Sequence, residues 1–130
     1  MTDRRPDCVY GVLVREGTVF LTRRGTALGL PGGVFRPLAE DRKVELRAHL
    51  EDQLGIRARA IWAQGAFDYR DPTEPCERFS GFYTVWEWDG DVPAESGVWL
   101  DTEAVSGAPL VPSLRILLTS ILATLALRTR

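Results

Sequence analysis

Residues 30–56 read LPGGVFRPLAEDRKVELRAHLEDQLGI and carry the strongest structural signals in this chain. Proline and paired glycines at 31–33 end any preceding strand with a turn, because proline lacks a ladder donor and glycine adopts positive φ freely. Asp41 is the predicted N-cap of the helix that follows, and Gly55 is its predicted C′ residue. An apolar stripe along one side of this helix is predicted by leucines at every fourth position, Leu46, Leu50 and Leu54.

The same helix carries polar residues that suggest chemistry. Glu45, His49 and Asp52 lie at i, i+4 and i+7, which places them on one side of a helix. Two carboxylates and an imidazole are a candidate site for a divalent cation, and Glu40 and Asp41 on the preceding loop would close over it. The alternative is a solvated helix face, in which Glu45 and His49 form an ordinary i, i+4 pair.

This stretch resembles the Nudix box, the signature of the Nudix (MutT-like) hydrolases. The family's box opens on glycine, includes a loop glutamate and ends in a helix reading Arg-Glu-apolar-x-Glu-Glu-x-Gly-apolar. Gly32 and Gly33 match the opening glycines, with one extra residue in the loop, and Glu40 matches the loop glutamate. Leu50 and the Gly55-Ile56 ending match the helix. The resemblance implies an α/β fold of the Nudix type, which is an α/β/α sandwich with a mixed β-sheet between helices.

The departures from the box fall on the residues that carry the family's chemistry. Ala48 stands where the family has Arg, His49 where it has Glu, and Asp52-Gln53 where it has Glu-Glu. The resemblance implies cleavage of a diphosphate bond with Mg²⁺ or Mn²⁺, which are hard cations that need oxygen ligands. Gln53 keeps the shape of glutamate without its charge, and His49 suits zinc or manganese better than magnesium. The box is therefore degenerate, and its usual metal site is weakened.

Candidate site residues follow from the helix face and from the resemblance together. If the protein is active, the cofactor is Mg²⁺ or Mn²⁺; otherwise it has none. The candidate metal ligands are Glu40, Glu45, His49 and Asp52, of which Glu45 and Asp52 are the candidate catalytic residues. The candidate substrate-binding residues are Gly32, Gly33, Arg23, Phe67 and Tyr69. The last two share a strand face and are the best candidates for stacking a base, although core packing is the commoner fate of strand aromatics.

Runs of β-branched and aromatic residues predict the rest of the sheet. The turn at Glu16-Gly17 makes the first two strands a hairpin. Gly65 leaves it open whether the third segment is one long strand or two joined by a bend, and the fourth alternates so that Phe82, Trp86 and Trp88 share one face of a central strand. The predicted strands are 8–15, 18–23, 57–70, 76–88 and 96–101.

The last predicted helix begins near Pro112, which suits a first helical turn. Its apolar stripe is wide, but Ile116 and Leu127 fall outside it. We expect these two side chains to be exposed in the monomer, where a homodimer contact would cover them.

Composition limits the classes of function. The 130 residues are 45% hydrophobic, which predicts a single domain over 1–130 with a substantial core. A net charge of −2 argues against a nucleic-acid partner. Neither a signal peptide nor a membrane span is predicted, because the most apolar stretch is short and interrupted by polar residues. Two widely spaced cysteines suggest ordinary thiols, so we expect a cytoplasmic protein.

These observations support one leading functional hypothesis and two alternatives. The leading hypothesis is a Nudix-type protein that binds a nucleoside diphosphate-linked or related small phosphate ligand, with hydrolase activity weak, altered or lost because the box glutamates are replaced. The first alternative is a divalent-metal-dependent nucleoside diphosphate-X pyrophosphohydrolase with a relocated carboxylate site. The second is a non-catalytic interaction module, whose sheet supports partner or homodimer contacts.

Overall fold

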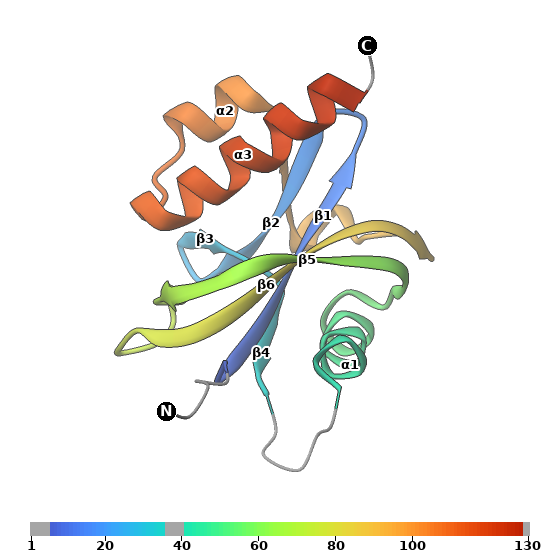
Figure 1. The fold of residues 1–130 in the computed structure, drawn as a ribbon, viewed down its shortest axis with the longest axis vertical. Helices are drawn as coiled ribbons and strands as arrows, with labels where there is room; N and C mark the ends of the chain where they lie inside the picture. The colour runs from blue at the N-terminus through green and yellow to red at the C-terminus, as the bar shows by residue number, and fades with distance from the viewer. Residues whose placement is uncertain (1–5, 36–40, 129–130) are drawn as a thin grey trace.

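A mixed β-sheet with helices on both faces forms the body of the molecule (Figure 1). The computed structural model describes residues 6–35 and 41–128. The strands are β1 (Cys8–Arg15), β2 (Thr18–Arg24), β3 (Ala27–Gly29), β4 (Gly32–Val34), β5 (Arg57–Tyr69), β6 (Arg78–Asp89) and β7 (Gly97–Leu100). The helices are α1 (Arg42–Leu54), α2 (Thr102–Gly107) and α3 (Pro112–Arg128), with a single 3₁₀ turn, η1, at Ala94–Ser96. The predicted α/β/α sandwich is confirmed.

The order of the strands places β1 beside β6, which is distant from it in the sequence. The sheet runs β3-β2-β1-β6-β5, and β4 pairs with β1 while β7 pairs with β2. β1 and β6 are parallel, and the remaining pairs are antiparallel. The predicted hairpin of β1 and β2 forms around Glu16 and Gly17, both of which have positive φ. β6 lies between β1 and β5, as expected of a central strand.

Side chains that alternate along β1 divide the core into two halves. Tyr10 and Val12 join the cluster beneath α2 and α3, whereas Val9 and Leu13 join the cluster beneath α1. Figure 1 shows α2 and α3 on one side of the sheet and α1 on the other. The sheet is therefore covered on both faces, and this explains why β1 is apolar at nearly every position.

α3 packs as its sequence predicts. Its stripe is buried, and Ile116 and Leu127 are each 71% exposed. Within the described parts of the chain, no helix is both long enough and apolar enough to cross a membrane.

β5 is one continuous strand of 13 residues, which resolves the alternative left open at Gly65. Gly65 has φ 131° and lies where the pairing with β6 shifts register after Ala63. The glycine therefore marks a bulge within the strand and does not end it.

The prediction that Phe82, Trp86 and Trp88 share one face of β6 was wrong. Phe82 and Trp86 pack on the α3 side of the sheet, whereas Trp88 packs on the α1 side and stacks on Trp99, with ring centroids 6.1 Å apart. The register of β6 against β5 shifts beside Trp86, where β6 carries one extra residue. A bulge of one residue reverses the alternation beyond it, so Trp88 points to the opposite face.

Both ends of α1 are capped as predicted. The Asp41 side chain accepts hydrogen bonds from the backbone N–H groups of Lys43 (2.8 Å) and Val44 (3.4 Å). Gly55 adopts a left-handed conformation with φ 69° and ψ 21°, and its N–H donates to the carbonyl of Glu51. The predicted stripe of Leu46, Leu50 and Leu54 is buried. These contacts fix the rotation of α1 and determine which of its side chains face β4.

Candidate functional site

The glycines that open the box-like stretch lie in a strand, and the expectation of a turn there was wrong. Gly32 and Gly33 belong to β4, which pairs antiparallel with β1 and places Gly32 opposite Tyr10. Gly32 has φ 142°, and a Cβ at this position would lie 2.1 Å from the Val9 carbonyl oxygen. Glycine is therefore needed at position 32 because the two backbones approach closely, and not because the chain reverses.

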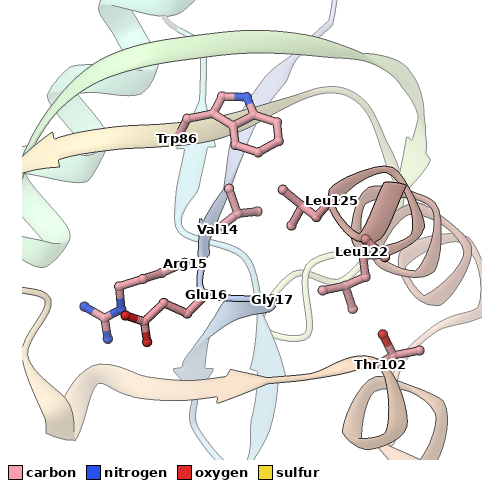
Figure 2. A pocket seen from close by; sticks show the side chains of 9 residues that line it. Val14, Arg15, Glu16, Gly17, Trp86, Thr102, Leu122 and Leu125 are labelled. Atoms are coloured by element: carbon pink, nitrogen blue, oxygen red, sulfur yellow. The ribbon is translucent and has the colours of Figure 1, made fainter. Parts of the chain in front are cut away.

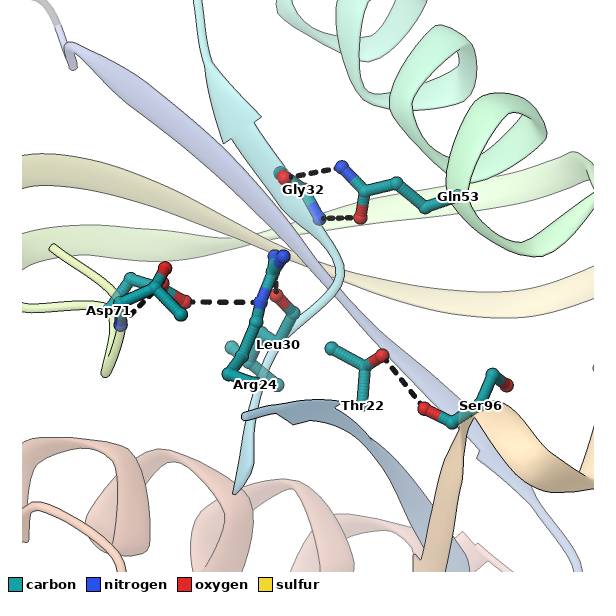
Figure 3. Close-up of polar contacts among 8 residues, drawn as sticks. Thr22, Arg24, Leu30, Gly32, Gln53, Asp71 and Ser96 are labelled. Atoms are coloured by element: carbon teal, nitrogen blue, oxygen red, sulfur yellow. Dashed lines mark hydrogen bonds and ion pairs between the residues drawn. The ribbon is translucent and has the colours of Figure 1, made fainter. Parts of the chain in front are cut away.

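The outer edge of β4 is bonded by side chains of α1 (Figure 3). The Gln53 amide donates from Nε2 to the Gly32 carbonyl (2.7 Å) and accepts at Oε1 from the Gly32 N–H (3.1 Å). One turn earlier, His49 Nε2 lies 3.0 Å from the Val34 carbonyl oxygen. A carbonyl only accepts, so His49 carries its proton on Nε2 in this contact. Gln53 and His49 are thus both engaged with backbone groups.

Of the expected metal ligands, the structure describes Glu45, His49 and Asp52, all on α1. Glu45 is only 3% exposed, while Asp52 lies on an exposed part of α1. Glu40 lies outside the described residues. Over residues 6–35 and 41–128, no group of three or more His, Cys, Asp or Glu side chains is placed to hold a metal ion. Gln53 was not expected as a site residue, yet its spacing four residues after His49 would have placed it on the same helix face.

A buried ion pair ties the loop after β5 to β2. Arg24 Nε lies 3.3 Å from Asp71 Oδ1, and Arg24 Nη2 donates to the Leu30 carbonyl (3.0 Å; Figure 3). Asp71 is 5% exposed and also accepts hydrogen bonds from the backbone and the hydroxyl of Thr73. Arg23, the arginine that was expected to bind substrate, is exposed. The anchored arginine is therefore its neighbour Arg24.

The two aromatic candidates share a strand face but have different surroundings. Tyr69 is 2% exposed and packs edge-on against Tyr10 and Phe82, with centroids 5.2 and 5.6 Å apart. Burial, with a further contribution from the charge of Asp71, raises the pKa of Tyr69, so its hydroxyl stays neutral at physiological pH. Phe67 is half-buried and stacks on Phe82 at 4.1 Å. Tyr69 thus belongs to the core.

Phe67 also reaches a surface pocket. The pocket has a volume of about 300 Å³ and is formed between β5 and the first half of α3. Its lining combines an aromatic ring, two aliphatic side chains and two hydroxyls, from Phe67, Ile116, Leu117, Ser113 and Ser120. Phe67 is therefore the predicted stacking residue that lies in a position to meet a ligand.

A second pocket of about 470 Å³ lies at the other end of α3 (Figure 2). Val14, Trp86, Leu122 and Leu125 form much of its wall. Arg15 also borders it, but its guanidinium lies over the Trp99 ring, 4.2 Å from the centroid. None of the predicted site residues that the structure describes lines this pocket.

The fold of this chain is similar to that of several solved hydrolases. A MutT Nudix hydrolase from Burkholderia pseudomallei superposes with a TM-score of 0.71 at 20% identity, covering 89% of this chain and 97% of that one. A MutT structure from work on Aliivibrio salmonicida and Vibrio cholerae gives 0.73 at 19%, covering 93% and 99%. A UDP-X diphosphatase gives 0.67 at 15%, covering 100% and 66%. No protein-family model and no curated protein sequence matches the chain. This protein therefore has the Nudix fold.

The Nudix fold implies a divalent cation, and the donors on the box helix do not fit one. Both polar atoms of the Gln53 amide are bonded to Gly32, and His49 Nε2 donates its proton to a carbonyl. The protonated Nε2 has no lone pair for a metal, which leaves Nδ1, a nitrogen donor that suits zinc better than Mg²⁺. Mg²⁺ and Mn²⁺ are held by clustered oxygen ligands, and the described residues provide no such cluster.

Proposed function

We propose that this Nudix-fold protein binds a nucleotide or a related small phosphate-linked ligand, and that its diphosphate-cleaving activity is weak or lost. The observation that carries this proposal is the engagement of Gln53 and His49 with the backbone of β4. Gln53 uses both of its polar atoms to support the strand, and His49 retains only Nδ1, a nitrogen that Mg²⁺ does not prefer. Neither side chain therefore replaces the carboxylates that would hold a cation to polarise a phosphate and activate water.

The pocket beside Phe67 is the proposed ligand site. Its volume of about 300 Å³ is at the lower end of the range for small-molecule sites. Phe67 supplies a flat apolar surface for a base, and a base stacked on an aromatic ring typically gains about 1–3 kcal/mol. Ser113 and Ser120 supply hydroxyls that donate and accept hydrogen bonds. The shared fold with a UDP-X diphosphatase supports testing nucleoside diphosphates first.

Ligand binding is tested by thermal unfolding with a panel of nucleoside mono- and diphosphates, nucleotide sugars and dinucleoside polyphosphates, in EDTA. A ligand specific for the folded state at about 100 times its Kd raises the free energy of unfolding by about 2.7 kcal/mol. Ile116→Glu places a negative charge on the pocket lining and is expected to weaken binding of an anionic ligand.

Leu127→Glu is the matched control for Ile116→Glu, because both side chains lie on α3 and both are 71% exposed. We expect the stabilisation by ligand to fall in Ile116→Glu and to persist in Leu127→Glu. Stabilisation that is equal in the two variants would place the ligand elsewhere. If no compound in the panel stabilises the protein, the interaction-module alternative gains support.

The hydrolase alternative needs a separate assay. Phosphate release from the same panel is measured with Mg²⁺, Mn²⁺ and Zn²⁺, using coupled phosphatase or pyrophosphatase where the product requires it. We expect little or no turnover. Turnover that disappears in Asp52→Asn would instead establish a working pyrophosphohydrolase with a relocated carboxylate.

A further inference from the structure

β4 is a short strand that pairs, among the described residues, with β1 alone. On its inner edge, the odd-numbered residues face β1: the Pro31 carbonyl accepts from Gly11 N–H (2.9 Å), and the Phe35 N–H donates to the Asp7 carbonyl (2.7 Å). Successive residues of a strand direct their backbone groups to opposite edges. The N–H and carbonyl groups of Gly32 and Val34 therefore face α1, away from β1.

Side chains of α1 bond three of these outward groups, as a second strand would. The Gln53 amide bonds both polar groups of Gly32, and His49 bonds the carbonyl of Val34. Unpaired backbone groups at a buried position are costly, and Gly32 is buried. The two side chains therefore hold β4 against α1. The bonded residues are 21 positions apart in the sequence for Gln53 and 15 positions apart for His49.

Only a neutral amide makes both bonds to Gly32. Its NH₂ group donates and its oxygen accepts, whereas a carboxylate has acceptors alone. With glutamate at position 53, an oxygen would face the Gly32 carbonyl oxygen where Nε2 now donates at 2.7 Å. Two acceptors at that separation repel unless a proton or a cation lies between them.

We infer that Gln53 is a positioning residue whose amide takes the place of a bridging cation, so that the β4–α1 junction is held in its shape without metal. The inference deepens the proposed function, in that it rests on the proposed loss of the metal site. It predicts that wild-type stability is insensitive to divalent cations and that glutamate at position 53 creates sensitivity to cations and to pH.

The test compares the full-length wild-type protein with Gln53→Glu and Gln53→Met, by thermal unfolding in EDTA and with MnCl₂ or MgCl₂. We expect no cation effect on the wild type. In EDTA at neutral pH, Gln53→Glu should melt lower by about 6–10 °C, since the hydrogen bond to the Gly32 carbonyl is lost and that buried carbonyl faces a charge. Manganese, or protonation of the carboxyl below about pH 5, should restore part of that loss.

Gln64→Glu is the matched control, because Gln53 and Gln64 are both exposed but Gln64 lies on β5, which does not pair with β4. It should show neither the loss of stability nor the manganese response. Stabilisation of the wild type by manganese would overturn the inference, as would a Gln53→Glu protein that is fully stable in EDTA at neutral pH.

If Gln53→Glu fails to fold, Gln53→Met still tests the bonds, because it keeps the length of the side chain and removes its polar atoms. The Gly32 amide should exchange with solvent at least tenfold faster in Gln53→Met than in the wild type. Unchanged exchange would show that Gln53 does not hold β4. No nucleotide is present in these experiments, so failure of the proposed ligand-binding function would leave their outcome unaffected.

Discussion

Gly32→Ala tests whether the close approach of β4 to β1 explains the glycine in the box-like stretch. Two separate penalties apply at this position. The φ of 142° is a conformation that alanine rarely adopts, and a Cβ would lie 2.1 Å from the Val9 carbonyl oxygen and 2.8 Å from the Tyr10 Cα. Both obstacles are backbone atoms, which a rotamer change cannot move aside.

The two penalties can be estimated separately. Backbone strain of this kind costs about 1–3 kcal/mol. Overpacking costs a further 1–3 kcal/mol, typically, because the strands must separate. The expected total is about 2–6 kcal/mol. With an unfolding entropy of about 2.1 cal/mol/K per residue, a chain of 130 residues loses about 4 °C of melting temperature per kcal/mol, so Gly32→Ala should melt about 8–24 °C lower.

Two other glycines isolate the components. Gly17 has φ 76°, and a Cβ added there would have nothing within 4 Å, so Gly17→Ala reports backbone strain alone. Gly97 has φ 177°, an ordinary extended conformation, but its Cβ would lie 2.1 Å from the Leu21 carbonyl oxygen, so Gly97→Ala reports the clash alone.

The assay is urea and thermal unfolding of the three single variants and the wild type, with far-UV circular dichroism as the signal that monitors unfolding. We expect Gly32→Ala to be the least stable, with a loss close to the sum of the other two. If Gly32→Ala cost no more than Gly17→Ala, the close approach of β4 and β1 would be refuted as the reason for glycine at position 32.

Three further changes test other parts of the structure. Asp71→Asn should cost about 2–3 kcal/mol, because it leaves the largely buried Arg24 guanidinium without its countercharge, and a double-mutant cycle with Arg24→Met should show strong coupling between the two sites. Alkaline pH should destabilise the fold. Burial raises the pKa of Tyr10 and of Tyr69 above the usual value near 10, so the unfolded chain loses these protons first. The free energy of unfolding should therefore fall above about pH 10, by about 1.4 kcal/mol per pH unit for each tyrosine. Urea unfolding from about pH 9 to about pH 11 measures that slope, and Tyr69→Phe should reduce it by one tyrosine's share; an unchanged slope would contradict the assignment. Asp41→Ala should cost about 1 kcal/mol and lower the melting temperature by about 4 °C, since the N–H groups at the start of α1 lose their acceptor, whereas Asp41→Asn should retain most of the stability.

Signals that act over a few residues predicted most of the elements. The β1–β2 hairpin depends on neighbouring strands and the turn at Glu16-Gly17, and α1 depends on its two caps and on leucines four residues apart. The local alternation failed where a long-range feature intervened. Trp88 points to the opposite face because the pairing of β6 with β5 shifts beside Trp86, and the sequence of β6 alone does not indicate that shift.

The candidate site was only partly predictable, for the same reason. Phe67 lines a pocket while Tyr69, two residues later, is enclosed by Tyr10 and Phe82, although both alternate onto the same face. The arginine that pairs with Asp71 is Arg24 rather than Arg23, which was the expected site residue. Which of two adjacent side chains meets a ligand or a buried partner depends on the elements packed over them.

By itself, the sequence determined the Nudix type of fold and which residues stand in the box-like stretch. Only the tertiary structure decided which groups Gln53 and His49 contact. Gln53 and His49 meet the edge of β4 because the leucine stripe fixes the rotation of α1, and because Gly32 lets β4 pack closely on β1. A polar side chain can be read from sequence as a donor or an acceptor, but its partner is chosen by the three-dimensional packing of segments that are distant in the chain.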